Sequence, residues 1–308
     1  MDINLALFYN PKDMTVADIT AIGERLDPGI RFRAYSTAHS HLLTPLKLLT
    51  RPSVTIELSH PWRFHPLNAK RLRQLRKGKI YTNRVTREAG LPVPKFEVIT
   101  RETVLDPAVW GPYVVVKPDL GGRGAYVLIH RTGRVRYKEP STLSRDHPGR
   151  KGAMMAEQFI YTGPWPVSHR VLTLFGEPML SIRYEAPHDM PPLPSSADFK
   201  SSGGGRSIVA TRHGCAISLY RDEEMLEIAR RVHAVFPEVP LLGQDLVRDA
   251  TTGKIYVLEI NPNGQTWMFT NRTGREMQAQ FQLDFYQQFD ALNTTARVFS
   301  EVARRYAK

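Results

Sequence analysis

The segment 241–264, LLGQDLVRDATTGKIYVLEINPNG, constrains the fold of this 308-residue chain more than any other part of it. Its two halves, LLGQDLV and IYVLEIN, alternate in the manner of strands, and the stretch between them carries Gly253, which is typical of a hairpin. Because side chains alternate along a strand, Glu259 and Asn261 share one face, and Asp245 can lie opposite them on the neighbouring strand. The pattern predicts two adjacent strands that bring three oxygen-bearing side chains together.

This set of an Asp, a Glu and an Asn supports two interpretations. Carboxylate and amide oxygens are the ligands that suit magnesium when it carries nucleotide phosphates. The alternative is a buried strand pair whose carboxylates are only capped or solvated. The segment leaves both open, and the motifs that precede it in the chain favour the metal site.

The composition indicates a soluble globular protein, since 42% of the residues are hydrophobic and 23% are charged. A chain of this length corresponds to about two domains. The N-terminus has no basic leader pattern, and no run of apolar residues is long enough to span a membrane. We therefore expect a cytoplasmic protein without a membrane partner. The single cysteine, Cys215, excludes an internal disulfide framework and a cysteine-rich zinc site.

The net charge of +12 favours anionic partners such as nucleotides, acidic metabolites, acidic peptides or nucleic acid. Much of this charge lies in residues 63–101, where eleven Lys and Arg residues face only Glu88 and Glu97. The centre of this run carries Leu72 and Leu75 three positions apart, a spacing that predicts helical surface. The run is either a solvated basic face or a surface for an acidic ligand or nucleic acid, which is the less favoured partner.

The first 60 residues predict a small α/β unit. A strand at 3–9 precedes a helix within 14–26 whose N-cap is Thr15, and two more strands follow at 30–36 and 53–59. No G-x-G-x-x-G follows the first strand, so the unit is not a complete dinucleotide-binding domain. We predict a helix from residue 68 to 88.

The remaining elements alternate between strands and helices. The predicted strands lie at 95–100, 112–118, 125–130 and 153–160, and a hairpin joins 169–176 to 178–186. A loop rich in Pro, Ser and Gly, 186–205, has the length of a substrate lid. The predicted helices are 221–236 and an amphipathic tail within 274–308.

A lysine precedes a glycine-rich turn in VVVKPDLGGRG. Lys117 can neutralise phosphate charge while the bare backbone at Gly121, Gly122 and Gly124 approaches phosphate oxygens. The same letters also suit a plain hairpin turn, so this motif alone leaves both interpretations open.

The order of the pieces resembles the ATP-grasp superfamily over roughly residues 68–270. The resemblance rests on GKIYTNRVTREAGLPVP, VVVKPDLGGRG, AEQFI, an arginine-bearing hairpin, and GQDLV followed by LEINPNG. It is nearest to the branch that holds ribosomal-protein glutamate ligases and glutathione synthetase. It implies an α+β protein with two α+β subdomains that grip ATP, preceded by a short α/β N-terminal domain. The boundaries it implies are 1–75, 76–160 and 161–308.

The resemblance also implies roles for particular residues. Two Mg²⁺ ions would be held by Asp245, Glu259 and Asn261, with Glu259 bridging them. ATP would be bound by phosphate contacts and by a hinge that recognises adenine: Lys79, Lys117, the glycine loop at Gly121, Gly122 and Gly124, and the hinge residues Glu157, Gln158, Phe159 and Ile160. Pro164 stands where many relatives carry a ribose-binding carboxylate, which leaves the ribose contact unassigned.

Further residues would serve the reaction and its substrates. Arg170 and Arg183 match arginines that steady the transferring phosphoryl group and the acyl phosphate, and Asn263 with Gly264 completes the turn beside the metal site. Lys200 and Arg206 lie where relatives carry a loop over the acceptor, and they either bind a carboxylate or phosphate or are simply solvated.

The function that the resemblance implies is an ATP-dependent carboxylate-amine ligase that acts through an acyl phosphate on an amino acid or peptide. Two alternatives remain: a kinase built on the same nucleotide site, and an ATP-regulated module that binds an acidic partner or nucleic acid. Relatives often form homo-oligomers. The sequence identifies neither substrate and does not fix the oligomeric state.

Overall fold

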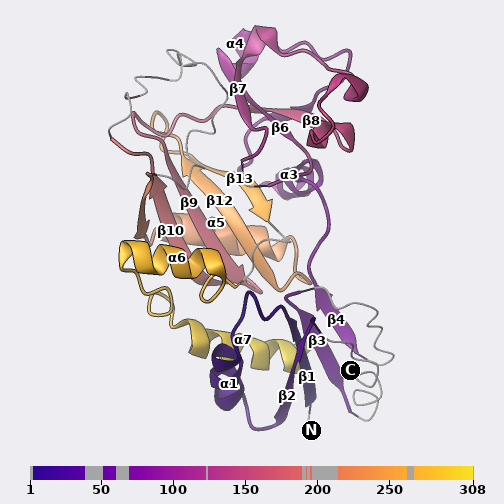
Figure 1. Cartoon of the computed structure of the whole chain (residues 1–308), viewed down its shortest axis with the longest axis vertical. Coiled ribbons are helices and arrows are strands. Elements are labelled where there is room, and N and C mark those ends of the chain that lie inside the picture. The colour runs from indigo at the N-terminus through magenta and orange to yellow at the C-terminus, as the bar shows by residue number, and fades with distance from the viewer. Residues whose placement is uncertain are drawn as a thin grey trace.

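The computed structural model describes residues 3–38, 51–59, 69–122, 124–188, 192, 195, 214–261 and 267–307. Its described strands form three sheets, which follow one another along the long axis of the molecule (Figure 1). The N-terminal sheet is at one end, the C-terminal sheet is in the middle, and a smaller sheet is at the other end. Among the described helices, none has the length and apolar character needed to cross a membrane.

The N-terminal sheet is parallel and has the order β2-β1-β3-β4. The strands are β1 (Ile3–Tyr9), β2 (Ile30–Ser36), β3 (Ser53–Glu57) and β4 (Lys70–Arg73). Helix α1 (Val16–Arg25) begins after Thr15, whose side chain accepts a hydrogen bond from the Asp18 N–H. The predicted strands, helix and N-cap of this unit are confirmed.

The helix predicted from residue 68 to 88 is wrong in its first half. Residues Lys70–Arg73 form the edge strand β4, which pairs with β3, and helix α3 (Lys79–Glu88) starts only after Gly78. The spacing of Leu72 and Leu75 misled the prediction because the two leucines enter different cores. Leu72 is buried in the N-terminal core, whereas Leu75 packs against the core beneath α5.

The small sheet is antiparallel and has the order β5-β8-β6-β7. Its strands are β5 (Phe96–Val98), β6 (Tyr113–Pro118), β7 (Leu128–Arg131) and β8 (Met154–Gln158). One short helix, α4 (Pro107–Trp110), and three 3-10 turns, η1 (Thr132–Arg134), η2 (Pro140–Thr142) and η3 (Pro148–Arg150), complete this part. All four predicted strands are confirmed; three are shorter than predicted, and β7 begins three residues later and ends one residue later than predicted.

The C-terminal sheet is antiparallel and has the order β11-β10-β9-β12-β13. Its strands are β9 (Val167–Leu174), β10 (Glu177–Glu185), β11 (Ala216–Leu219), β12 (Leu241–Arg248) and β13 (Ile255–Asn261). The helices that accompany it are α5 (Glu223–Ala234), α6 (Arg272–Phe281) and α7 (Ala291–Tyr306). Both predicted hairpins, β9 with β10 and β12 with β13, are confirmed.

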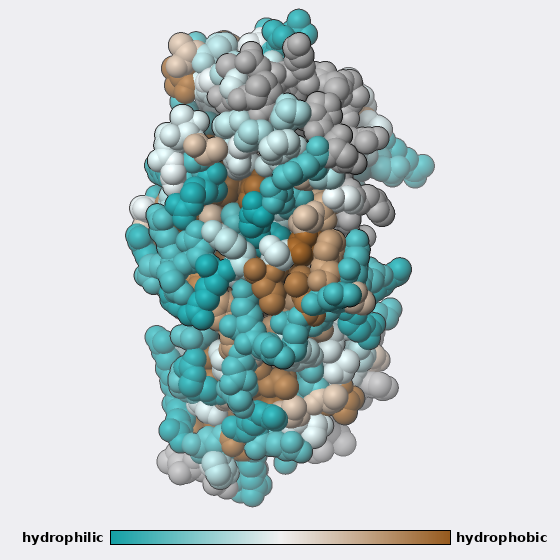
Figure 2. All heavy atoms as spheres, turned by 90° about the vertical axis from the view of Figure 1, so that its left-hand side faces the viewer, coloured by the Kyte–Doolittle hydropathy of each residue, from teal (hydrophilic) through white to brown (hydrophobic). Residues whose placement is uncertain are grey.

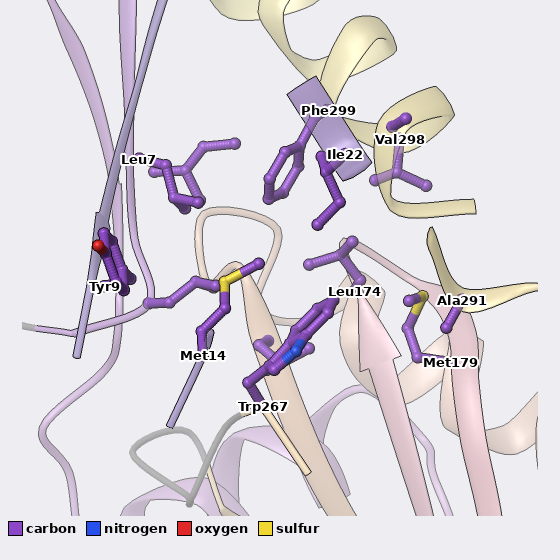
Figure 3. Close-up of a cluster of buried hydrophobic side chains, with 14 of the residues drawn as sticks. Leu7, Tyr9, Met14, Ile22, Leu174, Met179, Trp267, Ala291, Val298 and Phe299 are labelled. Carbon is purple, nitrogen blue, oxygen red and sulfur yellow. The ribbon is translucent and has the colours of Figure 1, made fainter. Parts of the chain in front are cut away.

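One large core joins the beginning and the end of the chain. Met14 and Ile22 from the N-terminal unit meet Phe299 of α7 and Leu174 of the C-terminal sheet, with Trp267 beneath them (Figure 3). Helix α7 therefore packs against α1 and the N-terminal sheet as well as against β10. The domain boundaries expected from the sequence stay a prediction.

The face of the molecule drawn in Figure 2 is mostly hydrophilic. Figure 2 shows teal side chains over much of one flank, with apolar atoms gathered in a hollow about halfway along the molecule, at the level of the C-terminal sheet. Helix α5 packs on one face of that sheet over an apolar cluster of its own.

A buried polar network fixes α5 to this sheet. His233 of α5 is 1% exposed, and its two ring nitrogens lie 2.7 Å from Thr173 Oγ1 and 2.8 Å from the Val239 carbonyl oxygen. Gln244 of β12 donates to Thr173 Oγ1 over 2.9 Å. Burial lowers the pKa of His233 to about 4 and that of His169 on β9 to about 4, the latter with help from Arg183.

Acidification from pH 7 to pH 5 is therefore expected to destabilise the fold through these two histidines. The two histidines are protonated near pH 6.5 in the unfolded chain but only near pH 4 in the folded chain. Between these values the unfolded state binds more protons, so the free energy of unfolding decreases as the pH is lowered. At pH 5 each histidine should contribute a loss of about 2 kcal/mol.

Urea midpoints measured at pH 7, 6 and 5 check this expectation. The variant His233→Gln should be less stable at pH 7 but should lose less stability on acidification than the unaltered protein. Parallel pH profiles for the two proteins would contradict the assignment to His233.

Candidate active site

Hydrogen bonds join the start of helix α3 to the loop that follows β6, beside the first candidate lysine, Lys79. Lys79 Nζ donates to the Gly121 carbonyl oxygen over 2.7 Å, and the Ile80 N–H donates to Asp119 Oδ1 over 2.8 Å. Gly78, the N-cap residue of α3, offers no side-chain acceptor, so Asp119 supplies it from another segment. The start of the glycine loop is thereby held beside Lys79.

The contact leaves no room for a side chain at position 78. A Cβ atom on Gly78 would lie 2.3 Å from both carboxylate oxygens of Asp119. We expect Gly78→Ala to displace Asp119 from the helix terminus, to lower stability by about 1–2 kcal/mol and to weaken nucleotide binding. Gly122→Ala is the matched control for stability, because a Cβ there meets nothing within 4 Å. Equal urea midpoints and equal nucleotide affinities for Gly78→Ala and the unaltered protein would contradict this role of Asp119.

The second candidate lysine forms a buried ion pair. Lys117 Nζ lies 2.8 Å from Glu157 Oε1 and also donates to the Leu258 carbonyl oxygen over 3.0 Å. Asn83 of α3 donates to the other carboxylate oxygen of Glu157 over 3.3 Å. Burial raises the pKa of Glu157, and the neighbouring ammonium of Lys117 opposes that rise. Lys117 thus joins the small sheet to strand β13 of the C-terminal sheet.

The predicted metal ligands lie on one face of the C-terminal sheet. Asp245 of β12 pairs directly with Glu259 of β13, and Asn261 Nδ2 lies 3.5 Å from Asp245 Oδ2. Glu259 Oε1 is 3.4 Å from Lys79 Nζ, so this carboxylate of the C-terminal sheet faces the start of helix α3. The proximity of the three oxygen-bearing groups, expected from strand alternation, is confirmed as geometry.

Arg170 holds the carboxylate of Asp245 from the neighbouring strand. Its Nε donates to Oδ1 over 2.8 Å and its Nη2 donates to Oδ2 over 2.9 Å, a two-point contact that fixes both groups. The charge of Asp245 is the main cause of the raised pKa of Arg170, and Tyr184 and Glu259 add to it. One guanidinium therefore faces the two carboxylates.

Arg183 does not join this group. On β10 it pairs with His169 of β9, whereas Arg170 pairs with Ile182. Paired residues share a face and successive residues alternate, so Arg183 points to the α5 side of the sheet and Arg170 to the opposite side. Arg183 instead contacts Glu185 over 2.5 Å. On β10 the polar residue that shares the face of Arg170 is Tyr184, two positions after Ile182.

The predicted adenine hinge, 158–160, begins at the last residue of β8, and its role stays a prediction. The Gln158 N–H donates to the Lys95 carbonyl oxygen over 2.8 Å, Phe159 comes next, and Ile160 is buried. Gly121 and Gly124 have φ angles of 131° and 68°, which favour glycine. The other predicted substrate residues fall outside the described residues: Lys200, Arg206, Asn263 and Gly264.

Sequence reasoning missed Asn83, Asp119 and Tyr184. Asn83 lies four residues after Lys79 on the buried face of α3, and this helical spacing was a signal that could have found it. Asp119 and Tyr184 gave no local signal, because their importance depends on contacts or strand register with distant segments.

The chain has the ATP-grasp fold. No protein-family model and no curated protein matches the sequence. Solved structures do match it over nearly the whole length: the D-cycloserine synthetase DcsG has a TM-score of 0.57 at 15% identity, covering 97% of this chain and 99% of DcsG.

The ATP-grasp ligase PsnB also matches. Its complex with precursor peptide PsnA2 and AMPPNP has a TM-score of 0.52 at 18% identity, covering 95% of this chain and 98% of PsnB. Its complex with a phosphomimetic variant of the minimal precursor, Mg and ADP has a TM-score of 0.51 at 17% identity, covering 96% and 99% of the two chains. The nearer resemblance to glutathione synthetase and ribosomal-protein glutamate ligases stays a prediction.

Proposed function

We propose that the protein is an ATP-dependent ligase that joins a carboxylate to an amine through an acyl phosphate. The observation that carries the proposal is the convergence of Lys79 and Lys117 from the small-sheet side with Asp245, Glu259 and Arg170 from the C-terminal sheet. Cations on one side and oxygen ligands on the other are what a triphosphate with its metal ions requires.

The donor set fits Mg²⁺ rather than a softer metal. Within the described ranges no group of three or more His, Cys, Asp and Glu side chains could hold a metal ion. The candidate set consists of two carboxylates and an amide, which suits a cation that keeps water and substrate phosphate among its ligands. When bound at Asp245, Glu259 and Asn261, Mg²⁺ would neutralise phosphate charge and align the triphosphate.

The protein side chains would act by binding and orientation. Lys79 and Lys117 would exchange their carboxylate partners for phosphate oxygens, and the glycine loop held by Lys79 would close over them. Arg170, fixed by Asp245, would face the charge that develops on the transferring phosphoryl group. Glu157 would present a carboxylate oxygen to the adenine amine, beside the hinge at 158–160.

The reaction balances without a protein nucleophile. A carboxylate oxygen of the first substrate attacks the γ-phosphorus of ATP, the bond from that phosphorus to the β,γ-bridging oxygen breaks, and ADP leaves. The amine of the second substrate then attacks the acyl carbon, phosphate leaves, and the amine loses a proton. Arg183 has no part in this scheme because it lies on the other face of the sheet.

The substrates we favour are amino acids or peptides. The structure of PsnB, which has the same fold, has been solved with a precursor peptide, and this supports testing peptides as substrates. The loop 186–206, where Lys200 and Arg206 lie, would contact the acceptor.

ADP release with a panel of amino acids and acidic peptides tests the proposal. Hydroxylamine added to the same reactions should trap the acyl phosphate as a hydroxamate, and the amide product should appear only with ATP, Mg²⁺ and both substrates. A stable phosphoester without hydroxamate would instead identify a kinase.

A further inference from the structure

Helix α3 has two faces of opposite character. Lys79, Thr82, Asn83 and Thr86 are buried on the face that meets the candidate site. The outer face and the strand end and linker before it carry five exposed cations, which we call the α3 basic surface: Arg73, Arg76, Lys77, Arg84 and Arg87. In Figure 1 this helix lies on the right flank of the molecule, where the linker rises from β4.

None of these five cations has a carboxylate partner in the part of the chain that the structure describes. The two cations just before them do: Lys70 pairs with Glu238, and Arg71 makes a two-point contact with Glu57 over 2.7 and 3.0 Å. Within α3 the one acidic residue is Glu88 at its last position. The positive charge of this surface is therefore uncompensated, which favours an anionic partner.

Of the two aromatic rings beside this surface, Tyr81 is 42% exposed and Phe96 is buried. Lys77 Nζ lies 5.3 Å from the centre of the Tyr81 ring, and Arg87 Cζ lies 4.5 Å from the centre of the Phe96 ring. Binding of single-stranded nucleic acid relies on open ring faces on which bases stack. The α3 basic surface offers one exposed ring against five exposed cations, and spaced carboxylates need only the cations, so this balance favours an acidic polypeptide over nucleic acid.

We propose that the α3 basic surface docks an acidic segment of a polypeptide in an extended conformation. The helix has 10 residues, which corresponds to about 15 Å along its axis and is covered by about five extended residues. Because the other face of α3 presents Lys79 and Asn83, a docked segment lies one helix diameter from the candidate site. The docking requires neither nucleotide nor turnover, so it stands apart from the proposed ligase activity.

Binding of a fluorescein-labelled octaglutamate peptide, followed by fluorescence anisotropy at low ionic strength, tests this surface. The triple variant Arg76→Glu, Lys77→Glu, Arg84→Glu should weaken binding at least tenfold. The control triple variant Arg134→Glu, Arg145→Glu, Arg275→Glu makes the same change in net charge at scattered exposed positions and should change binding by less than threefold. Added salt should weaken the binding of the unaltered protein, because these charges are exposed to solvent.

Two outcomes would overturn the proposal. Equal losses in both triple variants would show that only net charge matters. Tighter binding of an eight-nucleotide oligothymidylate, abolished by the same three substitutions, would assign the surface to nucleic acid. The neutral variant Arg76→Gln, Lys77→Gln, Arg84→Gln should lose an intermediate amount of affinity for octaglutamate. Circular dichroism checks that each variant folds, and the neutral variant serves as the test if the charge-reversed protein does not fold.

Discussion

Replacing Glu259 with glutamine is expected to lower ATP turnover by roughly a hundred- to a thousandfold while the fold persists. Glu259 faces both Lys79 and Asp245, and its carboxylate is the predicted bridging ligand between two magnesium ions. An amide of the same shape keeps the packing but loses the negative charge. Steady-state ADP release and magnesium titrations measure the effect.

Glu185→Gln is the matched control for this variant. Glu185 lies in the same sheet and also contacts a cation, Arg183, but both side chains project on the α5 side. Its turnover should stay within about threefold of the unaltered protein, because this partly buried ion pair lies on the face away from the candidate site and such pairs contribute little. Full activity of Glu259→Gln would remove Glu259 from the proposed metal site.

Replacing Asp18 with alanine should give the largest loss of stability. Asp18 of α1 is 5% exposed and accepts hydrogen bonds from Trp267 Nε1 over 2.5 Å, Thr270 Oγ1 over 3.2 Å and Tyr286 OH over 2.8 Å. Burial and this contact both raise the pKa of Tyr286. Thr270 Oγ1 also donates to the Asp13 carbonyl oxygen over 2.9 Å, so removal of the carboxylate leaves two donors, Trp267 Nε1 and Tyr286 OH, without their acceptor. Each costs about 1–3 kcal/mol, so we expect a loss of about 2–6 kcal/mol.

Urea unfolding of two further variants serves as the comparison for the stability loss of Asp18→Ala. Glu24→Ala changes an exposed acid on the same helix and should alter the free energy of unfolding by less than about 0.5 kcal/mol. Tyr286→Phe removes a single donor and should cost about 1 kcal/mol. An Asp18→Ala protein as stable as Glu24→Ala would show that the buried contacts contribute nothing.

Asp18 also links the N-terminal unit to the segment that follows the candidate metal ligands on β13. Trp267 follows the strand that carries Glu259 and Asn261 by only a few residues, and its indole is anchored on α1. We expect Asp18→Ala to lower ligase activity at temperatures where the variant is still folded, since the segment after β13 loses that anchor.

Prediction from sequence succeeded where the signal was local. The hairpin of β12 and β13 followed from alternation and turn residues, and the N-cap Thr15 followed from its place before an apolar helix face. Prediction failed at β4, because four residues with two leucines nearby fit a helix as well as a strand. Residues 70–73 form a strand because they pair with β3, and this pairing cannot be predicted from a local sequence pattern.

The candidate site divides in the same way. Strand alternation placed Glu259 and Asn261 on one face with Asp245 opposite them, and the pairing of Asp245 with Glu259 confirms this arrangement. The register of β9 against β10 was needed to separate Arg170 from Arg183, since a shift of one residue in either strand would exchange their faces.

The sequence by itself determined most of the strands and helices and the residue types suited to a nucleotide and its metal ions, because backbone alternation and turn chemistry act between near neighbours. Only the tertiary structure decided which groups meet: Lys117 with Glu157 and Leu258, Asp119 with the start of α3, and Tyr184 rather than Arg183 on the face of Arg170. These contacts join segments far apart in the chain, and they depend on how the sheets pack and on strand register.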